Sequence, residues 1–206
     1  MARRRRMTRD AKKQQVTPKN YGRFSGNPKT EWLTDAAAPD RDMKLAKDFW
    51  YEDPNGKRWS APAGSIINGA SIPKPLWSVV GSPYTDDYRC ASIVHDVACN
   101  DPTGDRAEAD RMFYFACLAG GCSESQARLL YLGVRIGAWS SAISSWEGLN
   151  RSALLYRTPP QVSVAEVSML ATFHELAAEA AALPPDAPFE KLESLVNKRL
   201  QVRADR

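Results

Sequence analysis

The chain has 206 residues, which is enough for one domain of ordinary size with extensions. Hydrophobic residues make up 43% of it, sufficient for a buried core, and the net charge of +4 is modest. Much of the positive charge gathers near the start, where Arg3 to Arg6 lead a basic arm with no apolar stretch behind it. This pattern excludes a secretory signal, which needs a hydrophobic segment after its charges.

The basic arm is typical of a solvated, disordered tail. The alternative is an arm drawn to an anionic surface, either nucleic acid or lipid, by counterion release and surface potential. Residues up to about Lys47 are rich in Pro, Gly, Asn and charge. We therefore divide the chain into an arm and linker at 1–47, a core domain at 48–148 and a helical extension at 149–206.

Two aromatic segments surround an Asn-Gly turn at the start of the core domain. Segments 48–52 and 57–61 flank the sequence Asp-Pro-Asn-Gly at 53–56. This arrangement predicts a β-hairpin. A short extended run at 62–67 is expected to follow it, before a loop that begins at Asn68.

The Asn-Gly-Ala-Ser loop at 68–71 is a candidate site element. Gly69 permits close approach of the backbone to an ion or substrate, and consecutive loop carbonyls can ligate Ca²⁺. The alternative is a tight turn that leads into the segment 74–81. The residues alone leave both interpretations open.

The stretch 88–99 is expected to form a buried helix, with Thr85 as its N-cap. From Cys90 to Cys99 it is apolar or small on all sides, apart from the adjacent pair His95 and Asp96. Buried ionisable groups are costly unless they are paired, coordinated or used. The pair therefore marks a candidate site.

A second helix, predicted at 106–118 and ended by two glycines, offers a partner for this histidine. Helical spacing places Asp110 on a mostly apolar face with Phe113 and Cys117, away from Glu108 and Arg111. If the two helices pack antiparallel, Asp110 can meet His95. A carboxylate on one imidazole nitrogen leaves the other free to act as a general base.

Three more helices are expected towards the C-terminus. A capping-box pattern at 123–126 opens an apolar helix to about Trp146, in which Gly133, Gly137 and Ala138 would admit another helix. Its arginines argue against a transmembrane span. A second capping box at 163–166 begins a helix to about 183, and another helix runs from 188 to about 202. We expect these two to form a helical hairpin that either docks on the domain or binds a protein partner. The fold class is mainly α with a small β-hairpin (α+β).

A set of motifs resembles an uncharacterised phage and bacterial family, domain of unknown function 1353. The motifs are Pro62-Ala63-Gly64, Asn68 to Pro73, Trp77, Ser82-Pro83, Tyr88-Arg89, His95-Asp96, Arg106, Ala109-Asp110 and Phe113. The resemblance runs from about Phe49 to Gly137. That family usually has Asp where this chain has Asn68, and its name supplies no activity.

The constellation also resembles the helix pair of phospholipase A2, in which a His-Asp pair is followed by an Asp on the next helix. The resemblance implies that His95 activates water and Asp110 orients it. It further implies that Asp96, with the loop at Asn68 and Gly69, binds Ca²⁺. The glycine-rich loop and the cysteine spacing correspond only loosely, so the likeness is one of constellation.

The sequence therefore predicts an ester hydrolase acting on phospholipid, with Arg89, Arg106 and Ser71 as supporting residues. One alternative is a hydrolase of cell-wall substrates with the same site. Another is a phage-associated structural or partner-binding protein, in which the polar groups only join two helices.

Four cysteines lie near the proposed site: Cys90, Cys99, Cys117 and Cys122. With no signal peptide and no Cys-x-x-Cys spacing, we expect reduced thiols and a cytoplasmic protein, with signal-independent export or virion association as alternatives. A disulfide between the two site helices is the less favoured arrangement. A zinc site from His95 and these cysteines is conceivable, but their irregular spacing disfavours it.

Overall fold

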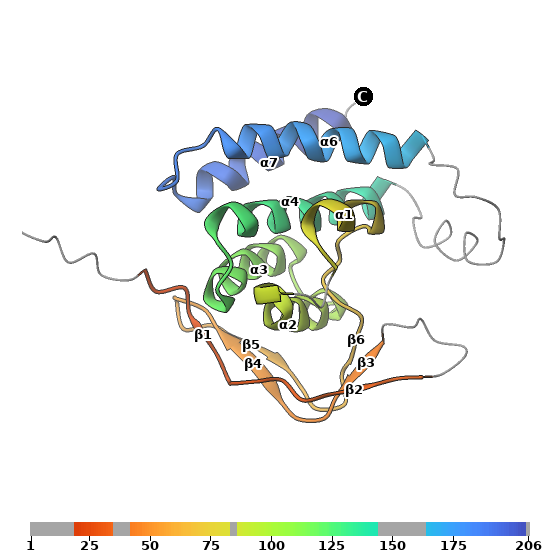
Figure 1. Cartoon of the computed structure of the whole chain (residues 1–206), viewed down its shortest axis with the longest axis vertical. Helices are drawn as coiled ribbons and strands as arrows, with labels where there is room; N and C mark the ends of the chain where they lie inside the picture. Colours follow the sequence, from red (N-terminus) through yellow and green to blue (C-terminus); the bar gives the residue numbers. More distant parts are fainter. Residues whose placement is uncertain (1–18, 35–41, 83–85, 144–163, 205–206) are drawn as a thin grey trace, which may run out of the picture.

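The computed structural model describes residues 19–34, 42–82, 86–143 and 164–204. The basic arm at Arg3 to Arg6 and the predicted cap at Thr85 lie outside these residues. The described part contains two small antiparallel sheets and a stack of helices, which confirms the mainly α fold with a small β component (Figure 1).

The predicted hairpin is present. Strands β4 (Phe49–Glu52) and β5 (Arg58–Ala61) pair antiparallel, with Tyr51 opposite Trp59. At the turn, Gly56 has a φ of 84°, a backbone region that glycine enters without steric cost. Tyr51 and Phe49 are buried in the core, so alternation along β4 turns one face of the hairpin inward.

The segment read as a linker contributes three strands. Strand β1 (Arg23–Phe24) extends the hairpin sheet to the order β1-β4-β5. Strands β2 (Thr30–Trp32) and β3 (Met43–Leu45) join β6 (Ile66–Ile67) in a second sheet. Strands of two or three residues are too short to show alternation in the sequence, so tertiary pairing decides them. The core therefore begins before residue 48.

Helices make up the rest of the described chain. They are the 3₁₀ turn η1 (Lys74–Leu76) with α1 (Trp77–Val80), the 3₁₀ turn η2 (Asp86–Tyr88) with α2 (Arg89–Asn100), then α3 (Arg106–Gly120), α4 (Glu124–Ile143), α6 (Val164–Ala181) and α7 (Phe189–Ala204). Figure 1 shows them layered on the sheets in the order α2, α3, α4, and finally α6 with α7. The last pair confirms the predicted C-terminal helices.

The ends of α3 follow directly from its sequence. Asp105 accepts hydrogen bonds from the backbone N–H groups of Ala107 and Glu108, which satisfies two donors that a helix start leaves open. At the other end Gly121 has a φ of 110°, and its N–H returns to the carbonyl of Leu118. These two caps fix the length of the helix that carries Asp110.

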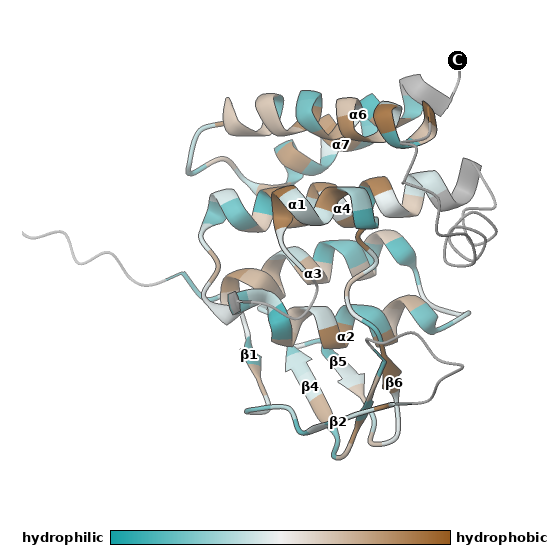
Figure 2. Ribbon diagram, turned by 45° about the vertical axis from the view of Figure 1, so that its right-hand side comes forward, coloured by the Kyte–Doolittle hydropathy of each residue, from teal (hydrophilic) through white to brown (hydrophobic). Residues whose placement is uncertain are grey.

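The apolar core runs through every layer. Figure 2 shows hydrophobic positions on the helices of each layer and on β6, and buried side chains range from Tyr51 in the sheet to Phe173 in α6. No helix among the described residues is both long and apolar enough to span a membrane.

Two glycines of α4 receive a loop, whereas the sequence had suggested a second helix. A Cβ on Gly137 would lie 2.2 Å from the carbonyl oxygen of Ser71, and one on Gly133 would lie 3.2 Å from Ile72. The segment that follows the Asn-Gly-Ala-Ser loop thus lies directly on α4. Small residues are needed here because another segment approaches α4 closely, as expected, but that segment is a loop and not a helix.

Candidate functional site

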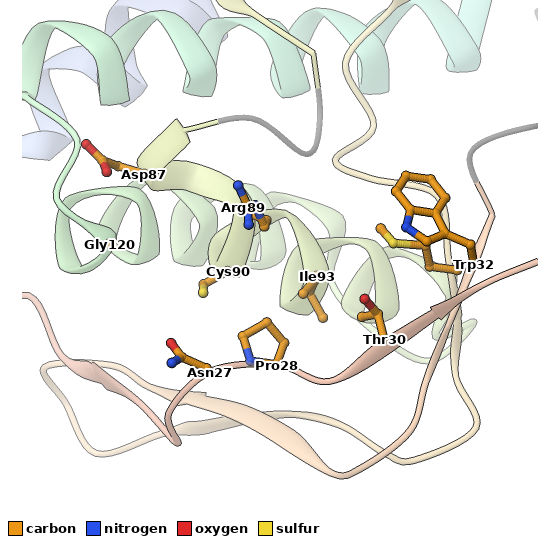
Figure 3. A pocket seen from close by; sticks show the side chains of 10 residues that line it. Asn27, Pro28, Thr30, Trp32, Asp87, Arg89, Cys90, Ile93 and Gly120 are labelled. Carbon is orange, nitrogen blue, oxygen red and sulfur yellow. The ribbon is translucent and has the colours of Figure 1, made fainter.

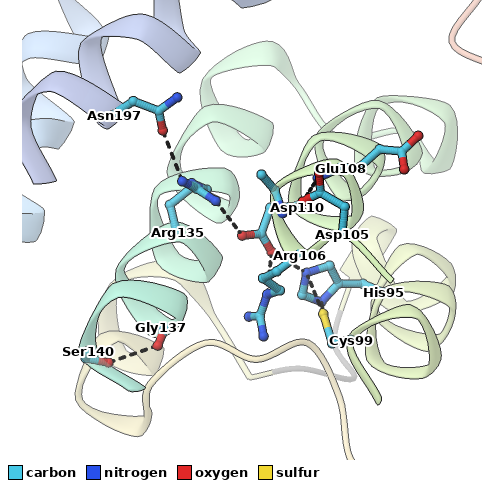
Figure 4. Close-up of polar contacts among 11 residues, drawn as sticks. His95, Cys99, Asp105, Arg106, Glu108, Asp110, Arg135, Gly137, Ser140 and Asn197 are labelled. Carbon is cyan, nitrogen blue, oxygen red and sulfur yellow. Dashed lines mark hydrogen bonds and ion pairs between the residues drawn. The ribbon is translucent and has the colours of Figure 1, made fainter. Parts of the chain in front are cut away.

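The structure brings His95 and Asp110 together, as the sequence predicts. The two helices that carry them are joined by a loop of five residues and pack against each other (Figure 4). Nε2 of His95 lies 2.8 Å from Oδ1 of Asp110, and both side chains are fully buried. The ring of Phe113 covers the imidazole, with 4.7 Å between the ring centroids.

Two arginines complete the polar cluster around Asp110. Nε of Arg106 donates to Oδ1 at 3.0 Å, one helical turn away on α3. A nitrogen of Arg135, on α4, donates to Oδ2 at 3.2 Å. The sequence indicated Arg106 as a partner of a site acid but missed Arg135. The signal in the sequence was an arginine in the middle of a mostly apolar helix, where a charged side chain needs a buried partner.

The cluster sets the protonation of its members. Burial disfavours the charged imidazole, but the neighbouring thiol of Cys99 and the carboxylate of Asp110 outweigh it and raise the pKa of His95 to about 9. Burial also raises the pKa of Asp110, but its hydrogen bond to His95 and the charges of His95, Arg106 and Arg135 lower it more. Asp110 is therefore an anion held among cations.

Cys99 is the residue that the structure adds to the pair. It lies one turn after His95, and its Sγ is 3.4 Å from Nε2 and 3.7 Å from Nδ1. His95, Cys99 and Asp110 offer ligand atoms within 4.8 Å of one another. Cys99 is only half-buried, whereas His95 is fully buried.

The predicted calcium residues meet, but through a different contact. Oδ2 of Asp96 accepts a hydrogen bond of 2.7 Å from the backbone N–H of Asn68, and the next residue, Gly69, has a φ of 99°. Ca²⁺ is bound by oxygen atoms directed at a common centre, whereas here the loop directs an N–H at one oxygen of this carboxylate. Calcium stays a prediction from the resemblance.

The remaining predicted residues lie apart from the pair. Among the described residues, the side chains bonded to Asp110 do not include Arg89. Instead, Arg89 lines a cavity of about 660 Å³ between α2 and the segment that holds β2, with Trp32 and Ile93 nearby (Figure 3). Ser71 presents its carbonyl to α4, where Gly137 makes room for it. Its role is thus one of packing.

The four cysteines, all within the described residues, are free thiols. Cys117 and Cys122 are buried and contact each other, and burial raises the pKa of Cys117. They do not belong to the group of His95, Cys99 and Asp110. The zinc set considered from the sequence is therefore not assembled, and Asp110 already binds two guanidinium groups.

These features define a small α+β domain with a buried His-Asp pair at its centre. Residues 43–134, which include His95, Cys99, Arg106 and Asp110, match the family described as "Protein of unknown function (DUF1353)". The match confirms the family resemblance read from the motifs. Arg135 lies one residue beyond the matched segment.

Two proteins of Sinorhizobium fredii (strain NBRC 101917 / NGR234) are similar to this chain. "Uncharacterized protein y4jT" is 34% identical over 114 residues, which are 55% of this chain and 33% of that protein. "Uncharacterized protein y4iH" is 40% identical over 96 residues, 46% of this chain and 40% of that protein. The chain thus spans well under half the length of these relatives. No solved structure matches it.

Proposed function

We propose that the protein is an ester hydrolase in which His95, held by Asp110, is the general base. The observation that carries the proposal is the 2.8 Å contact between Nε2 of His95 and Asp110. A carboxylate bonded to Nε2–H fixes the tautomer, so that the lone pair of the neutral imidazole is on Nδ1. Phospholipid is the proposed substrate class, from the resemblance to phospholipase A2, and cell-wall material is the alternative.

Two groups can give up a proton to this base. The first is water, as in the constellation that the sequence resembles. The second is the thiol of Cys99, favoured by its contact with both ring nitrogens and by its partial exposure. A thiolate beside an imidazolium would attack the ester carbonyl and break its C–O bond, and the imidazolium would give its proton to the leaving alcohol. Water, deprotonated by the neutral imidazole, would then hydrolyse the acyl-thiol intermediate to release the acid and regenerate Cys99.

The pH profile separates these two routes. With water as nucleophile, the active form carries neutral His95, so kcat/KM should rise with pH up to about 9, where His95 loses its proton. With a thiolate–imidazolium pair, the active form carries protonated His95, so activity should fall as pH rises through about 9. Cys99→Ser should preserve the first route and abolish the second.

A second candidate function is a non-catalytic role as a structural or partner-binding protein. It is supported by the complete burial of His95 and Asp110 and by the full set of partners around Asp110. Such a network stabilises the packing of α2, α3 and α4 without performing chemistry.

Hydrolysis assays on His95 variants distinguish the two functions. Purified protein would be assayed on phospholipid vesicles, a nitrophenyl ester and peptidoglycan, beside His95→Gln and the surface control Glu108→Gln. Loss of turnover by about 10² or more in a folded His95→Gln, with Glu108→Gln active, would support hydrolysis. Wild-type protein inert on every substrate, with His95→Gln reduced only in stability, would support the structural role.

A further inference from the structure

A cavity of about 520 Å³ lies on the side of the cluster where α3, α4 and α7 meet. It is lined by Arg106, Ala107, Arg135, Ala138, Trp139, Asn197, Leu200 and Gln201. Two of these described lining residues are cationic and none is acidic. The cavity therefore has a positive lining, with Asp110 behind it as the partner of both arginines (Figure 4).

Three hydrogen-bond donors on these lining residues have no acceptor among the described residues. They are a terminal nitrogen of Arg106, Nε of Arg135 and the indole Nε1 of Trp139, all buried at the atomic level. A buried donor without an acceptor costs about 1–3 kcal/mol, so three around one cavity indicate a missing acceptor. Nε of Arg106 donates to Asp110, and the two terminal nitrogens of Arg135 donate to Asp110 and Asn197, which fixes the orientation of both guanidinium groups.

We propose that this cavity binds a phosphate group, as the free ion or as a phosphate ester. The lining residues supply guanidinium groups from two different helices and an indole N–H, a set of donors that suits a tetrahedral anion with several acceptor oxygens. The amide side chains of Asn197 and Gln201 add polar lining at the outer wall. The volume leaves room for an organic group beyond the phosphate.

This site is distinct from the proposed hydrolytic one. An anion in the cavity faces Arg106 and Arg135, whereas His95 is not among the residues that line the cavity. Binding would brace α3, α4 and α7 together, because each contributes lining residues. The inference does not depend on the proposed hydrolysis, and it stands or falls by binding alone.

The test is a titration of the ¹⁵N-labelled full chain with inorganic phosphate at constant ionic strength, matched with chloride. The indole N–H resonance of Trp139 should move saturably, with a dissociation constant of about 1 mM or below. Calorimetry should show the affinity weakened about tenfold in Trp139→Phe, which keeps the ring and removes the donor. Trp32→Phe, on β2, is the matched control and should bind as wild type.

The same titration can overturn the proposal. No movement of the Trp139 resonance at about 10 mM phosphate, or an equal movement with chloride, would mean that water satisfies these donors. Trp139→Phe binding with unchanged affinity would equally exclude the site. If phosphate binds, vesicles of phosphatidylglycerol identify the source. Vesicle binding that phosphate competes away indicates a lipid headgroup, and its absence indicates a soluble phosphate.

Discussion

Two arginines on α4, seven residues apart, stand in different environments under the C-terminal helices. Arg128 donates to the backbone carbonyls of Ala180, Leu183, Pro184 and Pro185 around the end of α6, which a helix end leaves without partners. Arg135 donates to Asp110 and Asn197, and its Nε has no acceptor among the described residues. Arg128 thus donates mainly to uncharged backbone carbonyls, whereas Arg135 donates to the carboxylate of a charged cluster.

The interface between α4 and the C-terminal helices therefore has a structural end at Arg128 and a chemical end at Arg135. At the Arg128 end, the four hydrogen bonds go to backbone carbonyls, which do not titrate, beside a longer ion pair of 3.6 Å with Glu124. These hydrogen bonds hold α6 on α4. At the Arg135 end, the partners titrate, a cavity adjoins them and donors remain unused. Perturbations at the two ends should therefore differ in size, in pH dependence and in their effect on ligands.

The largest loss of stability is expected from replacing Asp110, the anion at the centre of the chemical end. Asp110→Asn keeps the shape but leaves His95, Arg106 and Arg135 without their counter-charge. Breaking a buried ion pair in this way costs about 3–5 kcal/mol of unfolding free energy. Urea denaturation measures this loss. Glu108→Gln is the control: it loses the exposed ion pair with Lys57 and should cost less than about 1 kcal/mol. Equal losses in both would contradict the cluster's importance.

Alkaline pH should lower the stability that the cluster of His95 and Asp110 contributes. The pKa of His95 is raised to about 9 from an ordinary 6.5, so its contribution is complete below about 6.5 and is lost as pH rises through 9. The shift corresponds to about 3 kcal/mol. Chemical denaturation between pH 6 and about 9.5 would show the decline, and His95→Gln should flatten it. A profile that His95→Gln leaves unchanged would assign the decline elsewhere.

At the structural end, Arg128→Met should cost about 2 kcal/mol, since it leaves carbonyls near the end of α6 without their donor. The loss should not depend on pH between 6 and about 9.5, because backbone carbonyls do not titrate. Arg111→Met is the matched control: it removes exposed pairs with Glu190 and Glu193 and should cost below about 1 kcal/mol. A pH-dependent loss in Arg128→Met would break the comparison.

The smallest effect on stability is expected at the cavity. Trp139→Phe removes a buried indole N–H that no described acceptor uses, which relieves about 1–3 kcal/mol, and loses part of the packing of the larger ring, which costs a similar amount. The unfolding free energy in phosphate-free buffer should therefore change by less than about 0.5 kcal/mol. Thermal melting with and without phosphate measures the difference. Phosphate should raise the melting temperature of wild type more than that of the variant. A large loss of stability without phosphate would show that this N–H has an internal partner.

Much of the helical part was predictable because its signals are local. The cap at Asp105, the stop at Gly120 and Gly121 and the capping box at 163–166 each act within one turn, so the helix limits could be read from neighbouring residues. The pairing of His95 with Asp110 was predictable for the same reason. The two helices are consecutive, and helical spacing places Asp110 on the apolar face of the second, so antiparallel packing brings it to the buried His95.

The rest was decided by contacts between distant segments. Strands β1 and β2 are stable only through their partners β4 and β3, and two or three residues carry no period of their own. Arg135 reaches Asp110 from 25 positions away, because α4 packs on α3. Whether the loop at Asn68 directs an N–H or a carbonyl at Asp96 depends on its backbone dihedrals.

The sequence by itself thus determined the helices, the hairpin and the pair at the centre of the domain, since hydrogen bonds and periodicity within a few residues specify them. Only the tertiary structure decided that two arginines surround Asp110, that Cys99 contacts His95, and that three residues with unpaired donors line one cavity. Packing settles these points, because each depends on how segments far apart in the chain are brought into contact.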